Sequence, residues 1–228
     1  ADFPIDPVDQ AEAIALLLSK LAVKKVAFIG ASYGAMVGMQ LAVLHPDLVG
    51  ALIAISAAHQ SHPFSSACRS LQREALTLGE SAGNPEAGVA LARAMAILTY
   101  RTREEFAERF CNRPAIVRNR VRVAAQPYLD AHGARHCARM SAPAYRRLSE
   151  SIDLHRVDPD QIRIPLTLVA VDHDQLVPAD DVRAFADAVP GSGFHLVQSR
   201  YGHDAFLKEE GQIAAILSQF LETLEHAQ

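Results

Sequence analysis

Short apolar runs that alternate with helical segments most constrain the fold of this chain. Residues 26–29 form a continuous apolar run that ends at Gly30, and residues 49–57 form another. Such runs are typical of strands that are buried on both faces of a parallel sheet. Residues 9–22 have the apolar period of an amphipathic helix, and a second helix, ended by Pro46, is expected between the two runs. This order predicts an α/β fold with a mostly parallel sheet.

The middle of the chain has a different pattern from its two ends. From residue 59 to residue 158 the strand-like runs vanish, and helices are expected at residues 66–78, 85–98, 103–110, 116–132 and 142–151. The core pattern then resumes. Strands are expected at residues 165–171 and 193–197, and helices at residues 180–188 and 204–224. We therefore divide the chain into an α/β core, residues 1–58 and 159–228, and an inserted helical lid, residues 59–158.

The composition excludes several classes of protein. The chain has 228 residues, with 22 Lys and Arg against 26 Asp and Glu and a net charge of −4. Nucleic-acid binding requires a basic excess on one face, so no nucleic-acid partner is expected. The apolar runs are much shorter than the ~20 residues that span a bilayer, so no membrane association is expected either.

The cysteines and histidines indicate neither disulfides nor a metal site. The chain has three cysteines, none of them in a C-x-x-C pair: Cys68, Cys111 and Cys137. Their odd number favours a reducing, cytoplasmic location. Two histidine pairs have ligand-like spacing: His59 with His62, and His132 with His136. No carboxylate or cysteine partner accompanies either pair, so we expect no metal.

The sequence Gly30-Ala31-Ser32-Tyr33-Gly34 lies between the first predicted strand and the helix that follows it. A G-x-S-x-G sequence in this setting predicts a nucleophile elbow, a sharp turn that exposes its serine above the sheet. The glycines relieve crowding where a side chain would collide with adjacent backbone. We therefore predict that Ser32 is a nucleophile; the alternative is a glycine-flanked turn with no chemical role.

A nucleophilic serine needs a histidine as base and an acid that orients the histidine, in the chain order Ser, Asp, His. Asp174 follows the third predicted strand, and His203 follows the fourth. The carboxyl ends of parallel strands meet at one edge of the sheet, so these residues can converge on Ser32 as a catalytic triad. Asp172 is the alternative acid, although strand alternation favours a structural role for it.

The backbone N–H of Tyr33, directly after Ser32, is the expected donor to a developing oxyanion. A second donor normally comes from a loop after an early strand, and no stretch before Ser32 supplies one. The strands that precede residue 26 in such a sheet are also missing from the chain. We therefore expect an upstream segment of the same protein to complete the site.

Further motifs occur along nearly the whole chain: Asp2-Phe3-Pro4, Gly30-Ala31-Ser32-Tyr33-Gly34-Ala35-Met36, Ile55-Ser56-Ala57-Ala58, Leu71-Gln72-Arg73-Glu74-Ala75, residues 92–102, Tyr128-Leu129, Ile152-Asp153-Leu154-His155 and residues 201–207. Together they resemble the homoserine O-acyltransferases, the acetyl- or succinyl-transferring enzymes of methionine biosynthesis within the α/β-hydrolase superfamily. The stretches Leu98-Thr99-Tyr100-Arg101-Thr102 and residues 201–207 are the most specific of them.

This resemblance implies an α/β-hydrolase fold, a helical lid over the site and a homodimer formed through that lid. It implies acyl transfer from acetyl- or succinyl-CoA, the co-substrate, to L-homoserine with no further cofactor. It also implies that Asp204 binds the ammonium of the acceptor, and that Arg73, Tyr100 and Arg101 contact the acceptor near its carboxylate. The alternatives are that the two arginines are solvated lid charges and that Asp204 is a helix N-cap.

Other functions stay open at this point. An esterase or thioesterase would use the same triad with water as the acceptor. A serine O-acyltransferase would use serine as the acceptor, which is one methylene shorter than homoserine. An inactive fragment would act only as an interaction piece. The chain departs from the family at Tyr33 and Ala35, where relatives often have Met and Gly, and at Met140-Ser141-Ala142-Pro143. The sequence does not separate acetyl from succinyl donors.

Overall fold

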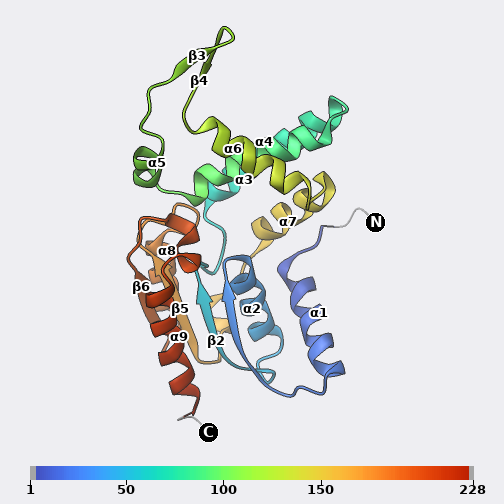
Figure 1. Ribbon diagram of the computed structural model, residues 1–228. Helices are drawn as coiled ribbons and strands as arrows, with labels where there is room; N and C mark the ends of the chain where they lie inside the picture. The colour runs from blue at the N-terminus through green and yellow to red at the C-terminus, as the bar shows by residue number, and fades with distance from the viewer. Residues whose placement is uncertain (1–3, 226–228) are drawn as a thin grey trace.

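The core of the molecule is a four-stranded parallel sheet with helices on both faces (Figure 1). The computed structural model describes residues 4–225, so Asp2 and Phe3 of the resemblance lie outside the described residues. The spatial order is β1-β2-β5-β6, and every neighbouring pair is parallel. The strands are β1 (Val26–Ala31), β2 (Val49–Ile55), β5 (Leu166–Val171) and β6 (Gly193–Val197). Among the described residues β1 pairs with β2 alone, at one edge of the sheet. The predicted α/β fold is confirmed.

Alternate residues of each strand face opposite sides of the sheet. On β2, Leu52 and Ala54 pack in one cluster with α2 and α8, whereas Ile53 and Ile55 pack in another with α9. The helices are α1 (Pro7–Lys20), α2 (Tyr33–Leu44), α8 (Ala179–Ala188) and α9 (Glu210–Glu225), with α1 packed against α2. Burial on both faces is the physical reason that β2 and β5 are continuous apolar runs. The same expectation is wrong for β1, because this strand lies at an edge of the described sheet and its Ala27 and Ile29 are exposed.

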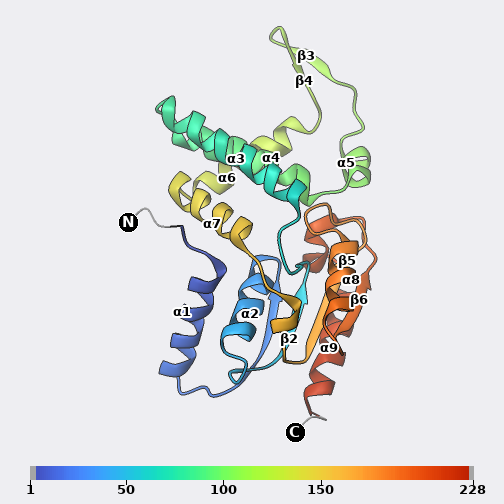
Figure 2. The ribbon, with the colours of Figure 1, turned by 180° about the vertical axis from the view of Figure 1, so that it is seen from behind.

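A helical lid is inserted between β2 and β5. Its helices are α3 (Pro63–Ser81), α4 (Pro85–Tyr100), α5 (Arg103–Arg109), α6 (Gln126–Cys137) and α7 (Ala142–Leu154). Both views show the lid above the end of the sheet at which the strands finish (Figures 1 and 2). Within the lid α3 pairs with α4, and α6 and α7 pack against this pair. None of the helices within residues 4–225 is long and apolar enough to cross a bilayer.

One expectation for the lid is wrong, because residues 116–132 do not form a single helix. Two exposed strands, β3 (Ala115–Val117) and β4 (Arg120–Arg122), form an antiparallel hairpin ahead of α6. The turn residues Arg118 and Asn119 have φ angles of 52° and 59°, which a right-handed helix excludes. Several side chains of the hairpin are β-branched and favour extended backbone.

The segment after β6 is also divided, although one helix was expected over residues 204–224. A 3₁₀ helix, η2 (Gly202–Leu207), comes first, and α9 begins at Glu210. Gly202 has a φ of 59°, and a Cβ there would lie 2.8 Å from the carbonyl oxygen of Tyr100. Glycine at this position therefore lets η2 lie directly against the end of α4.

Candidate active site

Ser32 lies in a strained turn between β1 and α2. Its backbone has a φ of 50° and a ψ of −121°, which residues other than glycine rarely adopt. Its N–H donates to the Ile55 carbonyl at 2.7 Å, and its own carbonyl accepts the N–H of Ala35 at 3.0 Å. A Cβ at Gly30 would lie 2.6 Å from the carbonyl oxygen of Gly34, so the turn requires glycine at position 30. A Cβ at Gly34 would meet no atom within 4 Å, so crowding does not explain that glycine.

The structure brings the side chains of Ser32, His203 and Asp174 into one hydrogen-bonded line. Nδ1 of His203 lies 2.7 Å from Oδ2 of Asp174, and Nε2 lies 2.8 Å from Oγ of Ser32. An ionised carboxylate only accepts hydrogen bonds, so Nδ1 carries the proton and Nε2 accepts the proton of the serine hydroxyl. The side chains of His203 and Asp174 are 7% and 0% exposed. The arrangement can therefore deprotonate Ser32 as its oxygen attacks a carbonyl carbon.

Two backbone N–H groups orient the carboxylate of Asp174. Its Oδ1 accepts bonds from the N–H groups of Leu176 at 2.8 Å and Val177 at 3.0 Å, which leaves Oδ2 for the imidazole. Asp172, the alternative acid, instead accepts the N–H of Ser199 at 2.9 Å. Asp172 therefore joins the ends of two strands, and Asp174 is the acid that contacts the histidine.

The first N–H of α2 belongs to Tyr33. An N–H in the first turn of a helix has no partner within the helix, so this group can bind an oxygen that gains negative charge. The Tyr33 hydroxyl shares a 2.7 Å hydrogen bond with Oγ of Ser151 on α7. Burial raises the pKa of this hydroxyl, which keeps it neutral. Tyr33 therefore joins the elbow to the lid.

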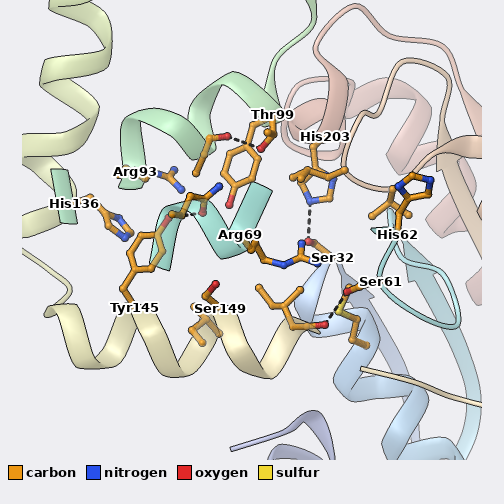
Figure 3. Close-up of a pocket in the computed structure, with 18 of the residues that line it drawn as sticks. Ser32, Ser61, His62, Arg69, Arg93, Thr99, His136, Tyr145, Ser149 and His203 are labelled. Carbon is orange, nitrogen blue, oxygen red and sulfur yellow. Dashed lines mark hydrogen bonds between the residues drawn. The ribbon is translucent and has the colours of Figure 1, made fainter. Parts of the chain in front are cut away.

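A cavity extends from Ser32 and His203 beneath the lid (Figure 3). Its volume is about 120 Å³, and part of it is open to solvent. Its walls come from α3, α4, α6 and α7 and from the loops that follow β2 and β5. Figure 3 shows Arg93, His136 and Tyr145 gathered at one end of the cavity and the catalytic side chains at the other. The lid therefore covers the catalytic side chains and supplies most of the residues that line the cavity.

The chain is similar to known proteins in both sequence and fold. A family model described as the alpha/beta hydrolase fold matches residues 2–210. The chain belongs to this α/β-hydrolase family. Two solved structures share the fold of this chain. A homoserine O-acetyltransferase from Bacillus anthracis has a TM-score of 0.89 and 16% identity over 96% of this chain and 66% of the other. Esterase E22 has a TM-score of 0.86 and 20% identity over 96% of this chain and 68% of the other.

Two curated relatives are similar to this chain over almost its whole length. A homoserine O-succinyltransferase from Xanthomonas campestris pv. campestris is 49% identical over 97% of this chain and 61% of the relative. A homoserine O-acetyltransferase from Thermus thermophilus is 35% identical over 96% of this chain and 59% of the relative. The chain therefore spans about three fifths of the length of these relatives.

Tyr100, Arg101 and Asp204 lie in different surroundings. Tyr100 lines the cavity, and the centre of its ring lies 5.6 Å from that of the His203 ring. Arg101 and Asp204 are not among the residues that line the cavity, and they pair with each other at 2.9 Å from Nη2 to Oδ2. Asp204 lies inside η2, ahead of α9, so it does not cap the final helix. Their predicted contacts with the acceptor stay predictions.

Arg73 is also not among the lining residues. Its Nη1 donates to Oδ2 of Asp153 at 2.6 Å and to Oγ of Ser149 at 2.8 Å, which joins α3 to α7. The arginine one turn earlier, Arg69, does line the cavity. The expected contact of Arg73 with the acceptor stays a prediction, and Arg69 is the arginine of α3 that lines the cavity.

Three charged residues that line the cavity were not predicted from the sequence: Arg69, Arg93 and Asp181. Arg93 lies within one of the stretches quoted for the resemblance, seven residues before Tyr100, and this spacing on one helix face was the available signal. Arg69 and Asp181 have no comparable signal, because many charges on amphipathic helices face solvent instead.

The end of the cavity remote from Ser32 has neutral polar groups around Arg93. The Tyr145 hydroxyl donates to Oε1 of Gln72 at 2.9 Å, and burial raises the pKa of Tyr145. Burial and then the charge of Arg93 lower the pKa of His136, whose buried Nε2 has no partner among the described residues. Arg93 makes no ion pair within residues 4–225. Its guanidinium is therefore available to a ligand carboxylate.

Proposed function

We propose that the protein is an acyltransferase that moves an acyl group from acyl-CoA to the hydroxyl of L-homoserine, in methionine biosynthesis. The observation that carries the proposal is the buried line of Ser32, His203 and Asp174 at one end of a lidded cavity whose other end holds Arg93. The names of the two curated relatives support homoserine as the acceptor. No cofactor enters the proposed reaction.

In the first half of the reaction Ser32 Oγ attacks the thioester carbonyl while His203 Nε2 takes the serine proton. Negative charge develops on the carbonyl oxygen, where the N–H of Tyr33 stabilises it. When the tetrahedral intermediate collapses, the carbon–sulfur bond breaks and His203 gives its proton to the departing thiolate. An ester between the acyl group and Ser32 remains.

In the second half the homoserine hydroxyl gives its proton to His203 Nε2, and its oxygen attacks the carbonyl carbon of the acyl-serine. When this second tetrahedral intermediate collapses, the bond between the acyl carbon and Ser32 Oγ breaks and His203 returns the proton to Ser32, which releases the O-acyl product. Transfer instead of hydrolysis requires that water be excluded and the acceptor be held in line. The guanidinium of Arg93 lies 5.1 Å from the centre of the Tyr100 ring, and that ring lies 5.6 Å from the His203 ring. Tyr100 is thus near both the base and Arg93, and a carboxylate bound to Arg93 lies toward the end of the cavity remote from Ser32.

The test measures CoA release from acetyl- and succinyl-CoA with L-homoserine, L-serine or water alone as the acceptor. We expect release that depends on homoserine, with the O-acyl product detected by mass spectrometry and no release by Ser32→Ala. Equal release without homoserine would instead identify a thioesterase, and a preference for serine would identify a serine O-acyltransferase. Failure of a fluorophosphonate to label Ser32 would identify an inactive protein.

We also propose that two copies of the chain associate through the lid. Leucines recur seven residues apart on two lid helices, each at least half exposed: Leu71 and Leu78 on α3, and Leu91 and Leu98 on α4. Exposed apolar stripes of this kind mark protein association sites. Light scattering is expected to give the mass of two chains, and the double change Leu71→Glu and Leu78→Glu is expected to give the mass of one. A wild-type mass of one chain would contradict the proposal.

A further inference from the structure

The turn between α4 and α5, from Tyr100 to Thr102, lies directly against the loop that carries His203; we call this turn the lid corner. A Cβ on Gly202, the residue before the base, would lie 2.8 Å from the carbonyl oxygen of Tyr100. The hydroxyl of Thr102 donates to the carbonyl oxygen of Arg200 at 2.5 Å. The rings of Tyr100 and His203 have centres 5.6 Å apart. The lid corner therefore contacts the base itself and the residues just ahead of it.

The lid corner also reaches the residue after the base and the loop of the acid. Arg101 Nη2 lies 2.9 Å from Oδ2 of Asp204, and the two side chains are 10% and 20% exposed. The carbonyl oxygen of Arg101 accepts Nε2 of Gln175 at 3.0 Å, and Gln175 directly follows Asp174. One turn of the lid thus joins the two loops that carry the acid and the base of the triad.

Thr102 is the residue through which the lid corner holds the base loop most directly. Its side chain is buried, with 2% of the residue exposed, so its hydroxyl has to find its partners inside the protein. The hydroxyl donates to the Arg200 carbonyl and accepts the N–H of Glu105 at 3.1 Å, in the first turn of α5. A single oxygen therefore fixes both the start of α5 and the backbone three residues before His203.

The core holds the same loop at other points. The N–H of Ser199 donates to Asp172, and Tyr201 and Ala205 pack in the core cluster beside α9. These contacts keep the loop on the sheet. The carbonyl at position 200 takes its donor from the lid, so the lid decides how the backbone runs from this position to the base.

We propose that the lid corner aligns the base with the nucleophile, and that Thr102 is a positioning residue for His203. The inference rests on the triad of the proposed function, whichever donor and acceptor the enzyme uses. Proton transfer from Ser32 needs the 2.8 Å contact between its Oγ and Nε2 of His203, and a misplacement of about 1 Å can lower a rate about 100-fold. Thr102 is not among the residues that line the cavity, so it acts through the histidine.

The first test measures the rate constant and the final extent of fluorophosphonate labelling of Ser32 in the full chain. Thr102→Val keeps the shape of the side chain and the methyl group that faces Gly202, but it lacks the hydroxyl. We expect its rate constant to fall by about 10- to 100-fold while labelling still goes to completion. Thr102→Ser, which retains the hydroxyl, is expected to stay within about threefold of wild type. A purely structural role would lower the final extent instead of the rate constant.

The matched control is Asn84→Ala, which removes another N-cap of a lid helix. Asn84 caps the opposite end of α4, where its Oδ1 accepts the N–H of Ala87 at 3.0 Å. Loss of either cap destabilises a lid helix to a similar degree. Because Asn84 lies far along α4 from the lid corner, its variant is expected to keep the wild-type rate constant.

The second test does not depend on activity. The proton on Nδ1 of His203, hydrogen-bonded to Asp174 at 2.7 Å, is expected to give a low-field proton NMR signal, which is assigned by its absence from His203→Gln. Thr102→Val is expected to shift or broaden this signal. Thr102→Ser and Asn84→Ala are expected to leave it in place.

Two results in folded Thr102→Val would overturn the inference: a wild-type rate constant, or an unchanged Nδ1–H signal. An equal loss of rate in Asn84→Ala would also overturn it, since the effect would then come from lid stability. If Thr102→Val does not fold, Gly202→Ala, which pushes the loop away from the Tyr100 carbonyl, has to lower the rate constant. No labelling of the wild type would overturn the proposed function, and the NMR signal would then decide the inference alone.

Discussion

The change Asp174→Asn tests how the site controls the proton on its histidine. Oδ1 of Asp174 accepts two backbone N–H groups, from Leu176 and Val177, and Oδ2 accepts Nδ1–H of His203. Asparagine has a single side-chain oxygen, and the two backbone donors hold it at the Oδ1 position. The new NH₂ group then faces Nδ1, which has to become an acceptor, so the ring proton moves to Nε2.

In that tautomer Nε2 of His203 can no longer accept the proton of Ser32. Loss of the correct tautomer in Ser-His-Asp triads lowers kcat by about 10⁴-fold, which corresponds to about 5 kcal/mol of transition-state stabilisation. Asparagine has the size and shape of aspartate, and the replaced side chain is 0% exposed, so the variant is expected to keep its place in the fold. The loss therefore reports proton control and not unfolding.

The assay is homoserine-dependent CoA release, with circular dichroism to show that the variant is folded. The matched control is Asp172→Asn, because its retained oxygen still accepts the N–H of Ser199, and its activity is expected to stay within about threefold of wild type. The reasoning is refuted if folded Asp174→Asn keeps more than a tenth of the wild-type activity, or if Asp172→Asn loses as much as Asp174→Asn.

Three further predictions concern the elbow, the lid and pH. Gly30→Ala places a Cβ 2.6 Å from the Gly34 carbonyl oxygen, so we expect the turn to shift and fluorophosphonate labelling to be lost; full labelling would contradict this. Tyr33→Phe removes the hydrogen bond to Ser151, and we expect the melting temperature to fall by about 2–4 °C, for about 1 kcal/mol; no change would show that the contact contributes nothing. Burial lowers the pKa of His155 to about 4 from 6.5, so the unfolded state binds more protons between these values. Stability that is present above pH 6.5 is then lost as the pH falls toward 4, by up to about 3 kcal/mol, which urea unfolding of wild type and His155→Gln at several pH values can measure; the same pH dependence in both proteins would refute it.

Much of the core and of the candidate site could be predicted because local rules govern them. A strand buried on both faces has to be a continuous apolar run, and the run that contains Ile53 shows this. The elbow has to have glycine where Gly34 approaches Gly30. Parallel strands put their following loops at one edge, so Ser32 and His203 could be expected to meet from their places after strands.

The contacts of the lid could not be predicted, because they depend on how helices are oriented in space. Arg69 and Arg73 are one helical turn apart and have the same chemistry, yet only the packing of α3 against Asp153 on α7 puts the first in the cavity and the second outside it. Arg101 pairs with Asp204 across the boundary between lid and core, a contact between segments far apart along the chain. Periodicity states which residues share a helix face, but the direction in which that face points comes from long-range packing, which no local pattern encodes.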